Sequence, residues 1–124
     1  MEVTDPNKLR VQAMNLLIDT LPRATTLGAV EFGGRLVESQ PPAAATVFPP
    51  EPVGANAAAM QAALKAVIHA DNGLTDYNEA FAKADADDPT AMARIFLTDG
   101  GHDAGTYNEA HLAHNVPTYV IESR

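Results

Sequence analysis

Oxygen-bearing side chains stand next to regular segments at two places in the chain, and their chemistry suits a cation. In IFLTDGGHD, residues 95–103, the carboxylate of Asp99 follows an apolar run, and in NGLTDYNEA, residues 72–80, the hydroxyl of Thr75 precedes a helical pattern. Such oxygens are the ligands that a hard cation such as Mg²⁺ takes. A buried strand has no packing reason to end in a carboxylate, so Asp99 is the stronger candidate. Simpler roles stay open: a turn before glycine for Asp99, and a helix start for Thr75.

A second group of candidate ligands contains three histidines. His111 and His114 are three residues apart on a predicted helix, so they are neighbours on its surface, and imidazole binds metals readily. Together with Asp99 and His102 they could serve a small metal-dependent hydrolase. The sequence has no His-Glu-x-x-His arrangement, however, so this enzyme is the alternative rather than the preferred hypothesis.

Composition argues against several other classes of function. The net charge is −8, and the eight Lys and Arg are scattered, so the sequence lacks the basic patch that nucleic acid or an anionic membrane surface requires. The absence of cysteine excludes disulfides and thiolate chemistry. Neither common glycine-rich nucleotide loop occurs, and no serine lies in a nucleophile elbow.

The chain has the composition of a single globular domain covering residues 1–124. Apolar residues make up 46% and charged residues 19%, which is typical of a folded protein rather than a disordered one. No apolar run approaches the ~20 residues of a membrane span. The first residues, MEVTDPNK, contain no signal-peptide core, and the compartment is not determined by the sequence.

The elements that must position Thr75 and Asp99 lie in the second half of the chain. In order, the sequence predicts a helix at 76–84, a strand at 93–99, a helix at 105–114 and a strand at 116–123. The first helix opens with a capping box from Asp76 to Glu79. The uninterrupted apolar run at 95–97 predicts a strand covered on both faces. The acidic run that follows the first helix, Asp85, Asp87 and Asp88, predicts a solvated helix end, with loose calcium binding as the alternative.

The first half predicts two helices and a hairpin. In order, we expect a helix at 5–21 capped by Asp5 and Pro6, a hairpin of strands 27–32 and 36–37 turning at Gly33-Gly34, a proline-rich irregular connection at 39–54, and a helix at 56–70 with Asn56 as N-cap. Strands that alternate with helices indicate an α/β protein. We predict a mostly parallel, Rossmann-like sheet with one antiparallel edge hairpin and helices on both faces, a three-layer α/β/α arrangement. Ligands of such sheets gather at the carboxyl ends of the strands, where Asp99 is expected.

Three stretches resemble the von Willebrand factor type A (VWA) family. LGAVEFGG, residues 27–34, is similar to that family's second strand and hairpin, and NGLTDYNEAFAKA, residues 72–84, to its Gly-Thr-Asp loop and the following helix. IFLTDGGHD, residues 95–103, is similar to its fourth strand, which ends in Thr-Asp-Gly. Order and spacing agree over nearly the whole chain, which is more specific than any single stretch.

The resemblance implies a metal-ion-dependent adhesion site. In the family, Mg²⁺ is held by an Asp-x-Ser-x-Ser motif, a Thr from a second loop and an Asp from a third, and an acidic residue of a partner protein completes the site. By resemblance, Thr75 is the second-loop Thr and Asp99 the third-loop Asp. The implied function is protein binding, metal-assisted and without catalysis.

The sequence departs from the family at both ends. It contains no Asp-x-Ser-x-Ser motif, and Met1 stands where the family has an internal Met after its first strand. The last residues stop at the family's fifth strand. The resemblance therefore implies a domain incomplete at both termini, weak or absent metal binding by this chain, and unpaired strand edges. A strand-swapped or edge-paired homodimer, another chain or an upstream segment would fill those edges.

Overall fold

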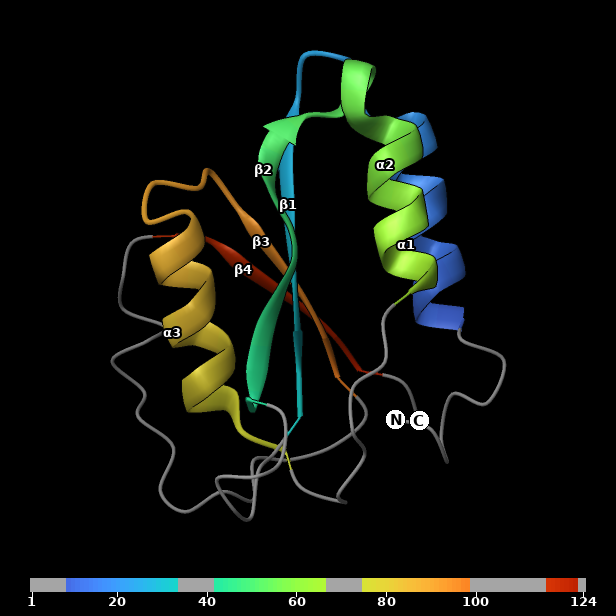
Figure 1. Ribbon diagram of the computed structural model, residues 1–124. Helices are drawn as coiled ribbons and strands as arrows, with labels where there is room; N and C mark the ends of the chain where they lie inside the picture. The colour runs from blue at the N-terminus through green and yellow to red at the C-terminus, as the bar shows by residue number, and fades with distance from the viewer. Residues whose placement is uncertain (1–8, 34–41, 67–74, 99–115, 123–124) are drawn as a thin grey trace.

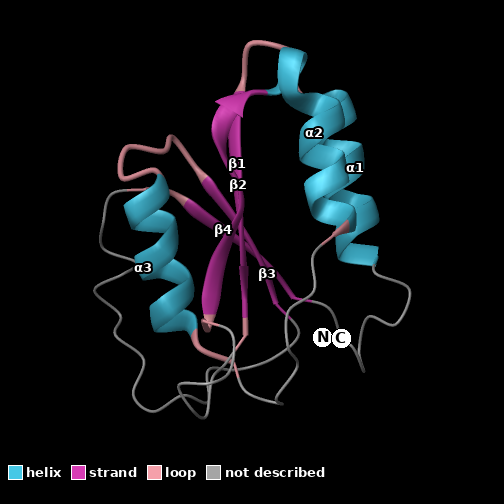
Figure 2. Cartoon of the chain, in the orientation of Figure 1, coloured by secondary structure: helices cyan, strands magenta, loops and turns pink. Residues whose placement is uncertain are grey.

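The fold is of the α/β class, as the sequence predicts. The computed structural model describes residues 9–33, 42–66, 75–98 and 116–122. The elements of these ranges, drawn in Figures 1 and 2, are α1 (Leu9–Thr20), β1 (Thr26–Phe32), β2 (Ala44–Pro52), α2 (Val53–Lys65), α3 (Tyr77–Asp87), β3 (Arg94–Thr98) and β4 (Thr118–Glu122). In Figure 1 the strands lie between α3 on one side and the pair formed by α1 and α2 on the other.

The described strands form two sheets of two strands each. β1 pairs with β2 in antiparallel orientation, and β3 pairs with β4 in parallel orientation. The register of the parallel pair is regular, and it sets Arg94 opposite Thr118 and Thr98 opposite Glu122. The predicted strands at 93–99 and 116–123 are thus confirmed over the ranges of β3 and β4, and the two strands are parallel. That both pairs belong to one sheet, covered by helices in a three-layer α/β/α arrangement, stays a prediction.

The prediction that residues 39–54 form an irregular connection is wrong, because β2 lies within them. Pro49 and Pro50 are tolerated in β2 because the ladder is interrupted where they occur. Leu27 pairs with Glu51 and Ala29 pairs with Phe48, so two residues of β2, Pro49 and Pro50, face the single residue Gly28. A Cβ at Gly28 would lie 3.0 Å from Cγ of Pro50, so glycine leaves the room that this bulge needs.

Helix α2 begins three residues before the predicted Asn56, and Asn56 is not its N-cap. The first N–H groups of α2 are satisfied by the loop after α1: Val53 donates to the carbonyl of Thr25 at 2.9 Å, and Gly54 donates to that of Arg23 at 2.9 Å. Because backbone carbonyls meet this need, no side-chain cap is required. Asn56 lies in the first turn and donates through Nδ2 to the carbonyl of Pro52 at 2.7 Å.

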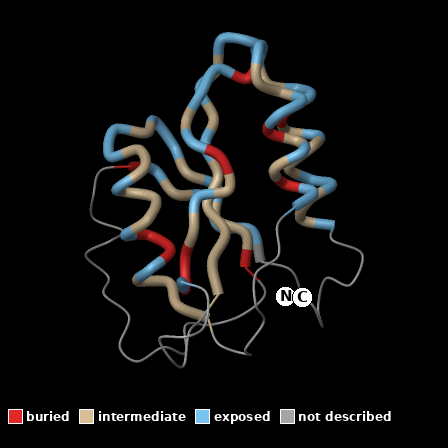
Figure 3. Tube along the Cα trace, in the orientation of Figure 1, coloured by how far each residue is buried: buried red, intermediate tan, exposed pale blue. Residues whose placement is uncertain are grey.

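The main core joins α1, α2 and β2. Its buried members are Ile18, Phe48, Val53, Met60 and Leu64, and Figure 3 shows the buried positions of the two helices. Met60 and Leu64 belong to the predicted helix at 56–70, whose last four residues, 67–70, lie outside the described residues. The predicted helix at 5–21 is confirmed over the range of α1, whereas its capping residues lie outside the described part.

Other predictions also concern residues that the structure does not describe. They are the turn at Gly34, the strand at 36–37, and the helix at 105–114. One further prediction is wrong: Ile95 is 51% exposed, so β3 is not covered on both of its faces. The apolar run at 95–97 therefore does not signal complete burial, because only one face of β3 packs against aromatic side chains of other elements.

Candidate functional site

The start of α3 is the point at which three separate segments of the chain meet. The N–H of Asp76 donates to the carbonyl of Gly33 at 2.7 Å, which ties the helix start to the end of β1. The hydroxyls of Tyr77 and Thr98 are 2.7 Å apart and share a hydrogen bond in which either can donate, which ties the helix start to the end of β3. The ends of β1 and β3 and the beginning of α3 thus lie at one end of the fold.

Helix α3 begins here because Asp76 caps it, as the capping-box pattern predicts. Asp76 is extended, with φ −117° and ψ 96°, and its Oδ1 accepts the N–H of Glu79 at 3.1 Å. Glu79 also places a negative charge in the first turn, where the helix dipole favours it. One carboxylate oxygen of Asp76 is therefore engaged in capping, in agreement with the predicted role of this residue.

An aromatic cluster holds the three segments together beneath the hydroxyl pair. Phe96 of β3 stacks on Phe32 of β1, with ring centroids 5.0 Å apart and an interplanar angle of 10°. Tyr77 approaches the same ring edge-on at 5.0 Å, and Phe81 stacks on it at 5.0 Å. Such pairs contribute roughly 0.5–1.5 kcal/mol each beyond the burial of their area. Because Thr98 is only 6% exposed, its hydroxyl bond is shielded from water.

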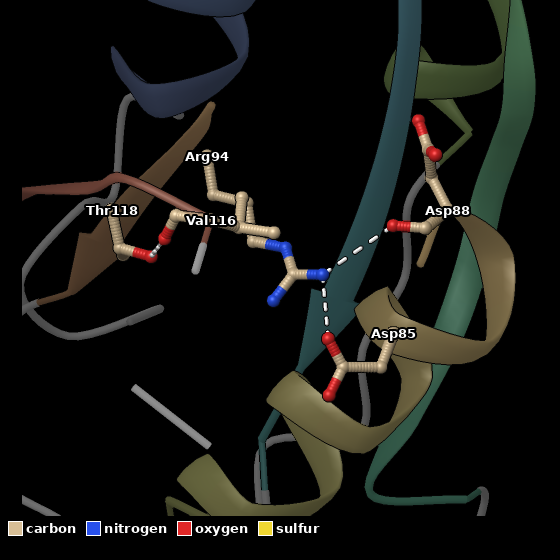
Figure 4. Close-up of polar contacts among 5 residues, drawn as sticks. All are labelled: Asp85, Asp88, Arg94, Val116 and Thr118. Atoms are coloured by element: carbon tan, nitrogen blue, oxygen red, sulfur yellow. Dashed lines mark hydrogen bonds and ion pairs between the residues drawn. The ribbon is translucent and has the colours of Figure 1, made fainter. Parts of the chain in front are cut away.

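The far end of α3 is tied to the beginning of β3 by a partly buried ion pair, shown in Figure 4. Nη2 of Arg94 lies 2.5 Å from Oδ1 of Asp85 and 3.4 Å from the carbonyl oxygen of Asp88. The Arg94 side chain is 10% exposed. Its backbone N–H also donates to the carbonyl of Pro117 at 2.8 Å, so Arg94 connects α3, β3 and the segment that leads into β4.

Two of the three carboxylates in the predicted acidic run are therefore paired within the protein rather than only solvated, contrary to the sequence prediction. Asp85 pairs with Arg94, and Asp87 pairs with Lys83 at 3.4 Å and accepts a hydrogen bond from Thr46 at 2.6 Å. These carboxylates already have cationic or hydroxyl partners within the protein. The alternative of loose calcium binding gains no support from this arrangement.

Of the two predicted metal ligands, the structure describes one. Thr75 is half-buried and lies directly before the cap of α3. Asp99 lies outside the described residues, and so do the histidines of the alternative enzyme, His102, His111 and His114. The structure does describe Thr98, the chain neighbour of Asp99, and it is this residue that meets Tyr77.

The possible metal ligands near the start of α3 are oxygen atoms. Mg²⁺ prefers oxygen ligands, but the described residues offer too few of them to complete a site. Thr75 and Thr98 carry hydroxyls, whereas Mg²⁺ takes about six oxygen ligands, water included. Within the described ranges no group of three or more His, Asp and Glu side chains could hold a metal. The described residues could therefore supply part of a magnesium site, and the remaining ligands would have to come from elsewhere.

The sequence reasoning missed the residues that make this convergence. Tyr77 belongs to the predicted helix at 76–84 and Thr98 to the predicted strand at 93–99, but their hydroxyl contact is not foreseen. A usable signal was present, because a Tyr at the first position of a helix and a Thr at the last position of a strand both carry a hydroxyl into an apolar setting. Each such hydroxyl needs a partner once it is buried.

Comparisons with known proteins give no independent assignment. Searches against protein-family models, curated proteins and solved structures found no significant match. None of the described helices is long and apolar enough to cross a membrane.

Proposed function

We propose that the chain is part of a VWA-like domain that binds another protein with the help of Mg²⁺ and without catalysis. The observation that carries this proposal is the 2.7 Å contact between Tyr77 and Thr98. It brings together the residue two positions after Thr75 and the residue directly before Asp99. The contact thus joins described residues that lie within two positions of each predicted ligand, at one end of the fold.

The strand arrangement supports the finer prediction of a three-layer α/β/α fold. A parallel pair and an antiparallel pair are both present, and the stacked rings of Phe32 and Phe96 connect them. In the proposed domain, the two pairs belong to one mostly parallel sheet, with the antiparallel pair at one edge. Helix α3 covers one face, and α1 and α2 cover the other.

In the proposed mechanism the Thr75 hydroxyl and the Asp99 carboxylate would contribute oxygens to the cation. Bound Mg²⁺ would supply an open coordination position that an acidic side chain of the partner protein could take. Asp76 fixes the helix start through its cap, and Tyr77 fixes that start against β3. Because the chain lacks the Asp-x-Ser-x-Ser motif that the resemblance calls for, we expect weak affinity for the metal.

Paramagnetic line broadening with Mn²⁺ in place of Mg²⁺ tests the proposal even if binding is weak. We expect selective broadening of the amide signals of residues 75–77 and of Thr98, and its competitive reversal by excess Mg²⁺. The variants Thr75→Ala and Asp99→Ala should lose this selectivity. The matched controls Thr90→Ala and Glu51→Ala, both at exposed positions away from the site, should keep it.

The same titration discriminates the proposal from the alternative hydrolase. Broadening centred on His111 and His114, together with a preference for Zn²⁺ in calorimetry, would contradict the adhesion-type site and favour the enzyme. Broadening centred on Asp85, Asp87 and Asp88 would also contradict the proposal.

A further inference from the structure

Within the described part of the chain, one edge of strand β4 is unpaired, and the apolar residues of the strand are unusually exposed. Its ladder runs to β3 alone among the described residues. Three consecutive residues are exposed: Tyr119 by 63%, Val120 by 60% and Ile121 by 56%. Neighbouring residues of a strand point to opposite faces, so both faces of the strand are accessible. A single exposed apolar residue is ordinary, but three consecutive ones on a strand with an unpaired edge require an explanation.

The centre of the β4 edge, Tyr119 to Ile121, lacks the features that normally prevent strands from pairing between molecules, although Pro117 and Glu122 flank it. Natural edge strands carry charges, prolines or bulges that block a further strand. Tyr119, Val120 and Ile121 carry no charge and include no proline, and the β3–β4 register has no irregularity. β2, by contrast, has prolines and bulges of this protective kind. The two sheets thus differ, and the one with the regular parallel ladder has the unprotected edge.

We propose that two copies of the chain pair through β4, antiparallel and across a two-fold axis at Val120. The strand is self-complementary in this register. Val120 faces its own copy, Tyr119 faces Ile121 of the second copy, and Thr118 faces Glu122. Aromatic side chains opposite β-branched ones stabilise antiparallel pairs, and no two like charges are opposed. The result is a continuous four-stranded sheet of β3 and β4 from each copy.

A second copy fits this edge better than a basic partner does. The paired residues are apolar, and the contact gains from burial and from backbone hydrogen bonds rather than from opposite charges. Each chain carries a net charge of −8, so the two copies repel one another at a distance. Salt screens that repulsion, and dimerisation should therefore strengthen as ionic strength rises. A basic partner would show the opposite dependence.

The dimer is expected to be weak. Five residues of one strand in each copy bury much less than the roughly 1,000 Å² of a stable interface, so association should be detectable at concentrations on the order of 100 μM. This inference does not depend on the metal site. A chelator should leave the association unchanged, and the two proposals can therefore fail separately.

Cysteine crosslinking tests the register directly, because the natural chain contains no cysteine. In the proposed pair, residue 120 faces itself with Cα atoms about 4.5 or 5.5 Å apart, which is within the range of a disulfide. With oxidised glutathione, Val120→Cys should form a disulfide-linked dimer about tenfold faster than the control Met92→Cys. Met92 is apolar and exposed but lies outside the strand. Equal rates for the two variants would overturn the proposal.

Sedimentation equilibrium tests the same contact without crosslinking. The wild-type chain should show a concentration-dependent dimer that strengthens with salt. Tyr119→Lys and Ile121→Lys should be monomeric, and Met92→Lys should dimerise normally, with circular dichroism confirming that all of them fold. A wild-type chain that stays monomeric well above 100 μM would refute the pairing, and so would a dimer that both strand variants retain.

Discussion

Removing the hydroxyl contact between Tyr77 and Thr98 tests whether the start of α3 is fixed against the end of β3. Tyr77→Phe and Thr98→Val each delete one hydroxyl and keep nearly the same shape. The 2.7 Å contact is part-buried, and Thr98 is 6% exposed, so water competes poorly for it. A neutral hydrogen bond contributes about 0.5–1.5 kcal/mol net, and this one belongs in the middle or upper part of that range.

The size of the effect also depends on what remains after each substitution. Both residues make further contacts, so deleting one partner does not leave the other without any interaction. The full cost of a buried unsatisfied group therefore does not apply, and each single variant should lose about 1 kcal/mol of unfolding free energy. In a domain of this length that loss lowers Tm by about 4 °C.

Urea unfolding of the wild type, both single variants and the double variant gives the coupling free energy of the pair. We expect a coupling of about 1 kcal/mol, because the double variant should cost little more than one single change. Tyr119→Phe and Thr90→Val, at exposed positions, should change the unfolding free energy by less than about 0.5 kcal/mol. Strict additivity, with a coupling below about 0.3 kcal/mol, would refute the contact and with it the convergence that supports the proposed function.

Three further substitutions test other parts of the fold by the same unfolding measurement. Arg94→Met breaks the partly buried pair with Asp85 and should cost about 2 kcal/mol, between the values for exposed and fully buried pairs; no measurable loss would contradict the ion pair. Gly28→Ala places a Cβ 3.0 Å from Pro50, and overpacking of this kind should cost about 1–3 kcal/mol, whereas a gain in stability would contradict the close approach of Gly28 to Pro50. Met60→Ala removes a buried core side chain and should cost about 2–5 kcal/mol, and a loss below this range would place Met60 outside the core.

The sequence predicts the elements whose signals are local. The cap of α3 at Asp76 depends on residues three positions apart, and the strand at 94–98 on an apolar run next to glycines. Both are confirmed. The parallel relation of β3 and β4 also follows from the sequence, because a predicted helix between two strands indicates a crossover connection.

Contacts between distant segments explain the failures. β2 is a strand in spite of its prolines because β1 supplies Gly28 opposite Pro49 and Pro50, which no local pattern in β2 could reveal. Likewise, α2 begins early because carbonyls of the loop after α1 accept its first N–H groups. The acidic run of α3 has partners on β2 and β3 as well as within the helix.

The two ties of α3 can form together only because the helix and β3 have matching lengths. The helix has 11 residues and the strand has five, so with their usual rises each spans about 16 Å. The two run in opposite directions: Tyr77 at the helix start meets Thr98 at the strand end, and Asp85 near the helix end meets Arg94 at the strand start. A helix longer or shorter by one turn, about 5 Å, would break one of the ties. The ion pair between Arg94 and Asp85 lies far from the proposed site, but it helps to fix the position of the end of β3. It thereby helps to position the hydroxyl of Thr98 next to Tyr77.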